Sequence, residues 1–571
     1  DPSALGALIN TSATAASYAG IVTLGAASSI GSDYINSVSG ITAGGNITLS
    51  GQVSGAFALT KVGSNTLNLT GITSASTNGG LTVALGTLEI SGASTTTNGA
   101  GALAVSAGPF TAQAGTSSQP FSYQTVSTPG GNAGINVLNL DYTGLSGSAS
   151  RINSHSVTLT GGELLLSIAS GPTAITQIES TAGNATTLSS DFNLIKLSTN
   201  STSSIELTTT LTIPLTRSGF GTGLIQGNNF GTATLGTAGD TNIVSTGTFA
   251  TTFFTGQVAV TSGALNTGIA PWLVVDSSST GVAGTYSFAT YNNNLVITNT
   301  IGIAPLASNN YETVSSTNWA TLSNITNYNQ LVTSTSTAAT LAANASGSLQ
   351  LYAPNSLTID NTIASGSTPI TIGAGNSLML QSGGVLDYSG NTTTIAGPGY
   401  LNATTTTTSL TTNATQLIFQ IFNDTNANNP GYGTTTLQVN ATVGGAIAPT
   451  TGGLVMSGDG TLVLNSTNVN SYTGTTSLNL GKLQFGSSAP ANNPIIYPFS
   501  VISGIAAFGT ATGITTGLLG SPLVVNAGAT LDLNGASQTV GQFNSVGTLP
   551  GTGGTVTNSN LTKAADLYVM N

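Results

Sequence analysis

Two stretches of the sequence decide the fold: residues 59–90 read LTKVGSNTLNLTGITSASTNGGLTVALGTLEI, and residues 454–485 read LVMSGDGTLVLNSTNVNSYTGTTSLNLGKLQF. They align without a gap at an offset of 395 residues. The identical pairs include Gly63/Gly458, Thr66/Thr461, Leu67/Leu462, Leu69/Leu464, Gly79/Gly474, Gly86/Gly481 and Leu88/Leu483. Self-similarity of this kind in a long chain indicates a repeat architecture.

A short strand motif recurs inside each copy. Residues 66–69 (TLNL) are followed 21 residues later by residues 87–90 (TLEI), and residues 461–464 are followed at the same spacing by residues 482–485. Apolar residues at every second position predict strands, and the spacing is close to one coil of a parallel β-solenoid. We therefore expect the second motif of each copy to stack on the first, one coil further along.

Related pieces of strand and turn punctuate the rest of the chain. Most alternate apolar and polar residues and have Gly, Asn or Ser close by, as tight turns require. These pieces are residues 46–50, 157–167, 348–359, 370–380 and 523–533. No sustained 3.6-residue period competes with them, and the Ala-rich residues 336–343 are the one stretch that could form a short helix.

The pattern predicts an all-β fold, a single continuous β-solenoid over residues 1–571 with irregular loop insertions. Within it we expect an N-terminal repeat block at 1–100, divergent and loop-decorated coils at 101–345, and a C-terminal repeat block at 346–571. The middle block is looser because residues 101–150 are rich in Gly, Ser and Pro. Each coil buries its inward side chains only against its neighbours, so one stack needs no linker.

The shortage of charge excludes several classes of function. The chain has 571 residues but only 6 Lys or Arg and 17 Asp or Glu, which is 4% charged with a net charge of −11; an ordinary domain has about 25%. Six cations cannot neutralise a run of phosphates, so we expect no nucleic-acid partner and no polybasic membrane contact. With 39% hydrophobic residues, the chain can still bury a core.

Membrane spans and cysteine chemistry are also excluded. Mean hydropathy is +0.25, yet no uninterrupted apolar stretch reaches the roughly 18 residues of a spanning helix, so we expect no transmembrane segment. The sequence contains no Cys, which rules out disulfides and thiolate metal sites. Because it starts at Asp1 rather than Met, we expect a processed mature chain or a piece of a longer one.

The repeat resembles the autotransporter-associated β-strand repeat, in which GxGTLxL leads through xYTGxT to a GxLxL strand. Residues 59–71, 80–92 and 457–486 carry this resemblance; residues 525–555 resemble the stretch that often follows such repeats, and residues 269–297 are similar to a further segment of large bacterial surface proteins. The resemblance implies a right-handed parallel β-helix outside a bacterial cell, as a secreted or surface-anchored passenger. No translocator barrel is expected before Asn571.

Few residues could carry catalysis. Hydrolysis of a polysaccharide needs two carboxylates within about 10 Å. The acids nearest in sequence, Glu179 and Asp191, are twelve residues apart, although stacking of neighbouring coils could bring distant acids together. A calcium-assisted lyase needs an acidic ligand cluster and a basic Arg or Lys. The sole histidine, His155, lacks the partners of a triad or a zinc site. The two arginines, Arg151 and Arg217, have no acid beside them. We therefore predict no enzyme activity, no catalytic, cofactor-binding or metal-binding residues, and no cofactor.

The remaining motifs favour structural interpretations. The turn at 457–460 (SGDG) resembles a single calcium-binding Gly-Asp turn, but an Asp that bonds its own turn backbone is the more common case. Asp459 and Lys482, one coil apart, could form an ion pair. A nucleotide-binding loop connects a strand to an amphipathic helix, and the Gly-rich residues 219–223 are not in such a setting. They therefore indicate a turn.

The leading hypothesis is a non-enzymatic extracellular structural protein, a β-helical rod that builds or coats a bacterial surface structure, secreted or at the cell surface. A neutral surface lacks the usual defence against association, so we expect a homo-oligomer, filament or sheath in which residues 1–10 and 564–571 cap the ends or pair with the next copy. One alternative is an adhesin whose Trp272 and Trp319 contact host or matrix glycans. A polysaccharide-degrading β-helix enzyme is the other.

Overall fold

The computed structural model is all-β throughout the part of the chain that it describes. That part comprises residues 6–31, 45–71, 80–92, 103–106, 126–128, 131–133, 136–143, 151, 156–168, 186–199, 207–211, 215–231, 240–245, 268–277, 286–292, 301–315, 329–341, 351–403, 416–424, 433–444, 452–468, 470, 472, 474–486, 522–546 and 553–569. The one helix in these ranges is the short 3-10 helix η1 (Ser308–Asn310). No helix among these residues has the length and apolar character needed to cross a bilayer.

The first stack consists of three rows of parallel strands, which we call 1a, 1b and 1c. Row 1a contains, in order, β3 (Ser28–Ile30), β6 (Leu59–Lys61), β8 (Leu81–Val83), β10 (Leu103–Ser106), β14 (Val157–Thr160), β16 (Thr186–Ser189) and β19 (Thr216–Ser218). Row 1b contains β1 (Ala16–Tyr18), β4 (Ile47–Leu49), β7 (Thr66–Leu69), β9 (Thr87–Ile90), β13 (Val137–Asp141), β15 (Glu163–Ile168), β17 (Phe192–Thr199), β20 (Thr222–Gly227) and β22 (Ala270–Asp276). Row 1c contains β2 (Val22–Thr23) and β5 (Val53–Ser54).

The second stack has the same organisation in rows 2a, 2b and 2c. Row 2a contains β25 (Tyr311–Thr313), β26 (Asn329–Val332), β29 (Ser356–Ile359), β32 (Gly384–Asp387), β35 (Leu417–Ile421), β38 (Leu454–Ser457), β40 (Thr476–Leu478), β42 (Leu523–Val525) and β45 (Phe543–Asn544). Row 2b contains β27 (Ala339–Leu341), β30 (Ser367–Ile372), β33 (Thr392–Ala396), β36 (Thr436–Val439), β39 (Thr461–Leu464), β41 (Gly481–Phe485), β43 (Ala529–Asp532) and β46 (Thr555–Thr557). Row 2c comprises two short sheets, with β28 (Leu351–Tyr352), β31 (Ser377–Leu380), β34 (Tyr400–Ala403) and β37 (Thr442–Val443) in one, and β44 (Gln538–Val540) and β47 (Leu567–Val569) in the other.

The 21-residue spacing is confirmed as the stacking register. Thr66 of β7 lies beside Thr87 of the parallel strand β9, and Thr461 of β39 lies beside Lys482 of β41. In both copies the alternate side chains are buried, so each coil contributes a layer of Leu, Ile or Phe to the core. The two repeats therefore superpose row on row, 1a on 2a and 1b on 2b.

The glycines shared by the two copies occupy corners that need left-handed backbone. Gly63 and Gly458 have φ of 77° and 85°, and Gly86 and Gly481 have φ of 78° and 77°. A residue with a Cβ is strained in this region, which explains why the two copies keep Gly at the same places.

The Ala-rich stretch 336–343, which could have formed a short helix, contains no helix in its described residues 336–341. Residues 339–341 form β27, which pairs in parallel with β30, and Ala339 and Leu341 are buried. Ala has a high helix propensity, but burial of these side chains in the second core and pairing with the next coil override it.

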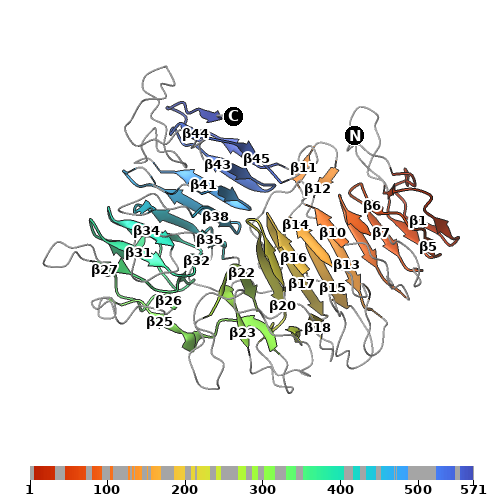
Figure 1. Ribbon diagram of the computed structural model, residues 1–571, viewed down its shortest axis with the longest axis horizontal. Coiled ribbons are helices and arrows are strands. Elements are labelled where there is room, and N and C mark those ends of the chain that lie inside the picture. Colours follow the sequence, from red (N-terminus) through yellow and green to blue (C-terminus); the bar gives the residue numbers. More distant parts are fainter. Residues whose placement is uncertain are drawn as a thin grey trace.

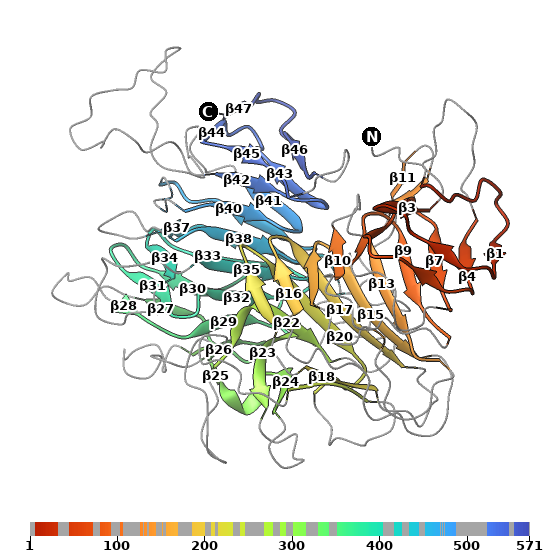
Figure 2. The same ribbon diagram turned by 45° about the vertical axis from the view of Figure 1, so that its right-hand side comes forward.

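The parallel pairing predicted to run through residues 1–571 is interrupted near the middle of the chain. Strand β22 pairs antiparallel with β23 (Tyr286–Asn292), and β23 pairs antiparallel with β24 (Ile301–Pro305). The same sheet continues through β21 (Thr241–Ser245) to β18 (Leu207–Leu211), and a separate antiparallel hairpin joins β11 (Val126–Thr128) to β12 (Gly131–Ala133). Figures 1 and 2 show the two stacks as two arms that meet near the green strands β22 to β24 instead of forming one rod. The limits of the three repeat blocks stay predictions.

An apolar seam joins the arms. On the outward face of row 1b, Leu194, Leu224 and Val274 lie in register on three successive strands, and all three are buried. They belong to one cluster with side chains from both arms, which comprises Phe192, Leu194, Leu224, Ile269, Val274, Tyr286, Phe288, Leu306, Leu386, Phe422, Leu480 and Ala527. The outward face of row 1b is thus buried at this point, because the other arm covers it.

Polar contacts fix the seam at its margins. The Arg217 guanidinium donates to Gln416 Oε1 at 2.8 Å, and the hydroxyls of Thr222 and Ser457 lie 2.7 Å apart. The Asn479 amide donates to the Phe220 carbonyl at 2.7 Å. These bonds join residues about 200 to 260 positions apart in sequence, so side chains help to hold the two arms together beside the short connection from β24 to β25.

Candidate functional site

The carboxylates of the described chain lie in strands as well as in turns. Burial, followed by the charges of Asp276, Asp459 and Asp424, raises the pKa of Tyr286, so these three acids lie near one another. Asp387 is fully buried, accepts from the Ser389 backbone N–H at 3.0 Å and from the Thr393 hydroxyl at 2.8 Å, and burial raises its pKa to about 6. Asp191 is also buried, and desolvation raises its pKa well above the usual range. Asp387 and Asp191 are therefore shielded from a bound polysaccharide by burial.

The Gly-Asp turn at 457–460 is confirmed as a turn, with Asp459 bonded to a neighbouring coil. Its carboxylate accepts from the Asn423 backbone N–H at 2.9 Å, and desolvation raises its pKa to about 6. In the described residues no group of three His, Cys, Asp or Glu side chains gathers to hold a metal ion.

The ion pair expected between Asp459 and Lys482 is wrong. The Lys482 ammonium lies 2.7 Å from Asp532 Oδ2, on the following coil of row 2b. Asp532 is inaccessible while Lys482 is about one-third exposed, and hydrogen bonds and the ammonium hold the pKa of Asp532 at about 2.

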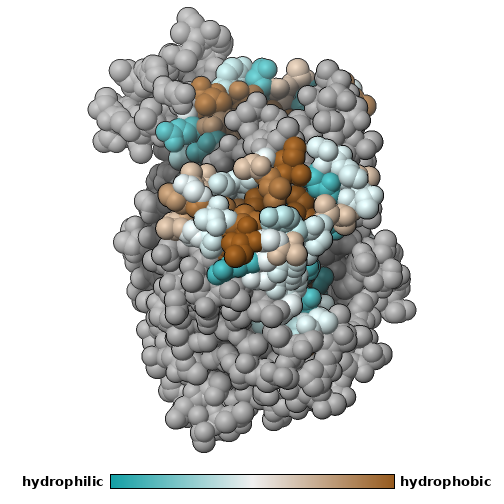
Figure 3. All heavy atoms as spheres, turned by 90° about the vertical axis from the view of Figure 1, so that its right-hand side faces the viewer, coloured by the Kyte–Doolittle hydropathy of each residue, from teal (hydrophilic) through white to brown (hydrophobic). Residues whose placement is uncertain are grey.

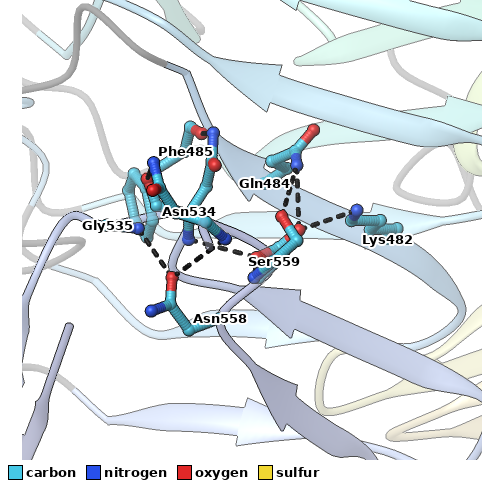
Figure 4. Close-up of polar contacts among 9 residues, drawn as sticks. Lys482, Gln484, Phe485, Asn534, Gly535, Asn558 and Ser559 are labelled. Atoms are coloured by element: carbon cyan, nitrogen blue, oxygen red, sulfur yellow. Dashed lines mark hydrogen bonds and ion pairs between the residues drawn. The ribbon is translucent and has the colours of Figure 1, made fainter. Parts of the chain in front are cut away.

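Asp532 lies at the centre of a polar network that joins the last strands of the second arm. Figure 4 shows its partners Lys482, Gln484 and Ser559, with Asn534 and Asn558 beside them. The two oxygens of Asp532 accept from the Gln484 amide at 2.8 Å and from the Ser559 backbone N–H at 2.9 Å. The Asn534 amide donates to the Phe485 carbonyl at 2.8 Å, and the Gly535 N–H donates to Asn558 Oδ1 at 2.8 Å. Strands β41, β43 and β46 are thus joined by side chains as well as by their ladders.

Of the two candidate glycan-contact residues, the structure describes only Trp272. Trp272 lies on β22 with 6% of its surface exposed and packs in the hydrophobic core of the first arm, so it presents no face to a glycan. The physical reason is that β22 is covered on both sides, by the first core and by the second arm. Trp319 lies outside the described residues, as do His155, Glu179 and Glu206.

The two arginines have structural partners. Arg151 is buried over the Tyr142 ring at 5.4 Å from its centroid and donates to the Gly92 carbonyl at 2.9 Å. Burial lowers the pKa of Arg217 to about 10. The adjacent Gly-rich residues 219–223 form a turn that leads into β20, as expected.

The outermost strands of the first arm form an apolar face that we call the N-face. It comprises residue Leu8, which bridges to Ile30 beyond β3, together with β1 and β2. Leu8, Tyr18 and Ile21 are exposed by 37%, 53% and 67%. Figure 3 looks onto this side of the molecule, where apolar residues form a patch among more polar ones.

The outermost strands of the second arm form a matching C-face, which comprises β45, β46 and β47. Phe543, Val556, Tyr568 and Val569 are exposed on it by 36% to 47%. Phe57 and Leu561, also near these faces in sequence, complete the large exposed apolar side chains of the described chain. These side chains therefore concentrate at the two outer faces, as an interaction surface would require.

In the described residues the strands of both faces lack the usual protection of a sheet edge, although Lys563 and Asp566 lie between β46 and β47 and the Tyr568 hydroxyl donates to Asp566 Oδ2 at 3.2 Å. No charged residue occurs among the described residues before Lys61, and the three strands of the C-face contain neither a charge nor a proline. Natural edge strands commonly use Lys, Pro or a bulge to prevent pairing. Of the exposed apolar residues on the two faces, the predicted end segments 1–10 and 564–571 contain only Leu8, Tyr568 and Val569. The sequence does not indicate the others, because alternation in a short strand does not show whether a single apolar side chain is buried.

A comparison of the chain with protein-family models, with curated proteins and with solved structures finds no match.

Proposed function

We propose that this chain is a non-enzymatic extracellular structural protein that assembles with copies of itself to build or coat a bacterial surface structure. In this proposal both arms are right-handed parallel β-helices of the autotransporter-repeat type. The observation that supports it is the pair of outer faces, whose strands contain no charged residue and on which most of the exposed large apolar side chains of the described chain lie.

The scarcity of charge also supports a structural role. With 23 charged residues in 571, counted as 6 plus 17, few groups respond to salt, and several acids are buried in turns. Because salt screens interactions between exposed charges, a protein with few charges changes little when the salt concentration around it changes, as it does outside a cell. The glycan-adhesin alternative loses one of its two residues because Trp272 is buried.

Electron microscopy and sedimentation velocity of the purified chain over a wide concentration range test the proposal. We expect oligomers or filaments whose population grows with concentration, and labelling of the protein on intact cells of its source. Monodisperse single particles at every concentration would remove the assembly function, and a protein found only inside cells would remove the surface role.

A further inference from the structure

The two outer faces correspond row by row. The repeat alignment places β6 and β8 of row 1a on β38 and β40 of row 2a, and β7 and β9 of row 1b on β39 and β41 of row 2b. Rows 1c and 2c follow rows 1b and 2b in chain order, since β2 follows β1 and β47 follows β46. Every row of one face therefore has a counterpart in the other.

Each pair of matching rows also places exposed apolar groups on both faces. In the a rows these are Leu8 and Phe543. In the b rows they are Tyr18 and Val556, on β1 and β46, which are both three residues long. In the c rows they are Ile21, next to β2, and Tyr568 on β47.

Strand direction makes the faces complementary rather than alike. Within each arm every coil stacks in parallel on the one before it, so β46 presents its free edge in the direction in which row 2b grows, and β1 presents its free edge in the opposite direction. A second copy that places its β1 on β46 continues a parallel ladder. Two N-faces or two C-faces of one stack type can meet only by antiparallel pairing.

We infer that the C-face of one copy receives the N-face of the next, with residue Leu8 on β45, β1 on β46 and β2 on β47, so that the coil continues from molecule to molecule. This inference rests on the proposed self-assembly and names its partner, a second copy of the chain. Such a head-to-tail contact is heterologous, so it closes into a ring or grows as an open filament. Unsatisfied backbone groups of both edges pair, and the exposed apolar side chains lose contact with water.

Single-cysteine variants test the row assignment, because the natural chain has no Cys. Ser17→Cys on β1 and Thr557→Cys on β46 are exposed positions of the matching b rows, and Thr23→Cys on β2 is an exposed position of row 1c. A short bis-maleimide reagent is added to mixtures of two variants. We expect cross-linked pairs from Ser17→Cys with Thr557→Cys and at least several-fold fewer from Thr23→Cys with Thr557→Cys.

An edge-blocking variant gives an independent readout. Val556→Lys places an ammonium on the free edge of β46 and should weaken self-association by about tenfold or more in sedimentation velocity. Thr335→Lys, at an exposed turn away from both faces, is the matched control and should leave association unchanged. Circular dichroism of both variants checks that they fold.

The outcomes separate this inference from the broader proposal. Assembly that persists in Val556→Lys, or cross-links that are equally abundant in the mismatched mixture, would overturn the row-on-row contact while leaving self-assembly in place. An absence of any assembled species in the natural chain would overturn both.

Discussion

Lys61 shows how one residue can satisfy a corner in two ways. Its side chain is fully buried, and its ammonium donates to the carbonyls of Val62 at 2.8 Å, Gly63 at 2.5 Å and Leu85 at 3.0 Å. The equivalent residue of the second copy, 395 positions later, is Met456, which is also buried. The same corner is therefore compatible with a bonded cation or with an apolar side chain of similar length.

We predict that Lys61→Met changes the free energy of unfolding by only about 1 kcal/mol, because relief of the cost of burying an ammonium offsets the lost hydrogen bonds. Lys61→Ala should cost about 2–4 kcal/mol, since it also leaves a cavity. Chemical denaturation measures both. If the methionine variant were as unstable as the alanine variant, the hydrogen bonds and not the packing would hold the corner.

The buried carboxylates predict that stability decreases towards neutral pH. Burial raises the pKa of Asp387 and of Asp459 from 3.8 to about 6, so the folded chain binds more protons than the unfolded chain between about pH 4 and 6. Their stabilising contribution is complete below pH 4 and is lost as the pH rises through 6. Asp532, whose pKa is lowered to about 2, acts in the opposite sense and favours the fold above pH 4.

We therefore expect the highest melting temperature near pH 4, with a decrease by pH 7, measured by circular dichroism at constant ionic strength. Asp387→Asn keeps an acceptor for the Ser389 N–H but cannot ionise, so it should flatten part of the decrease between pH 4 and 7. A melting temperature that rises steadily from pH 4 to 7 would contradict the assignment.

At the scale of single elements, the corner glycines separate backbone strain from steric exclusion. Gly481 and Gly366 both have left-handed backbone, with φ of 77° and 75°. A Cβ added to Gly481 would lie 2.6 Å from the Gly460 carbonyl oxygen of the preceding coil, whereas a Cβ on Gly366 would meet no atom within 4 Å.

Gly366→Ala should thus cost only the conformational strain, about 1–2 kcal/mol. Gly481→Ala should cost clearly more, because the coils of row 2b must also separate. Urea unfolding of the two variants measures the difference directly. Equal losses would show that the coils give way freely at this corner.

The strands were predictable because their signals are local. Alternation over four residues and a 21-residue spacing were sufficient to place β7 on β9 and β39 on β41. The partner of Lys482 was not predictable, because 48 residues separate Leu483 from its register partner Leu531 and no fixed coil length applies there. The spacing therefore points to Asp459, the acid nearest to Lys482 in sequence, and not to Asp532, its actual partner.

The outer faces were only partly predictable for a related reason. Alternation tells which side chains of a strand point inward, but the exposure of Tyr18 or Val556 depends on whether another strand follows in space. The seam between the arms had a usable signal: residues 271–275 (PWLVV) and 417–419 (LIF) are apolar without alternation, as expected of strands covered on both faces.

At the scale of the whole molecule, the seam decides the shape. A stack of parallel rows normally buries side chains only inward, but the outward face of β17, β20 and β22 is also covered here. Strand β22 contacts β32 and β35, and the second arm contributes Leu386, Phe422, Leu480 and Ala527 to the shared cluster. Phe422 lies at the centre of this contact. Its ring stacks on Tyr286 at 4.6 Å between centroids and lies 6.4 Å from Phe192 of the first arm.

Phe422→Ala should cost about 3–5 kcal/mol in the seam and so loosen the arms, because it removes the ring that contacts aromatic side chains across the contact. Phe485→Ala is the matched control: Phe485 is equally buried, but its contacts lie within the second core. We expect small-angle X-ray scattering to show a larger radius of gyration for Phe422→Ala and not for Phe485→Ala, in conditions where circular dichroism finds both variants folded. Because the two faces sit on different arms, the same loosening should broaden the curvature of any assembly that the chain forms, which electron microscopy would show. An unchanged radius of gyration for Phe422→Ala would mean that the antiparallel strands β22 to β24 set the arrangement of the arms without help from the seam.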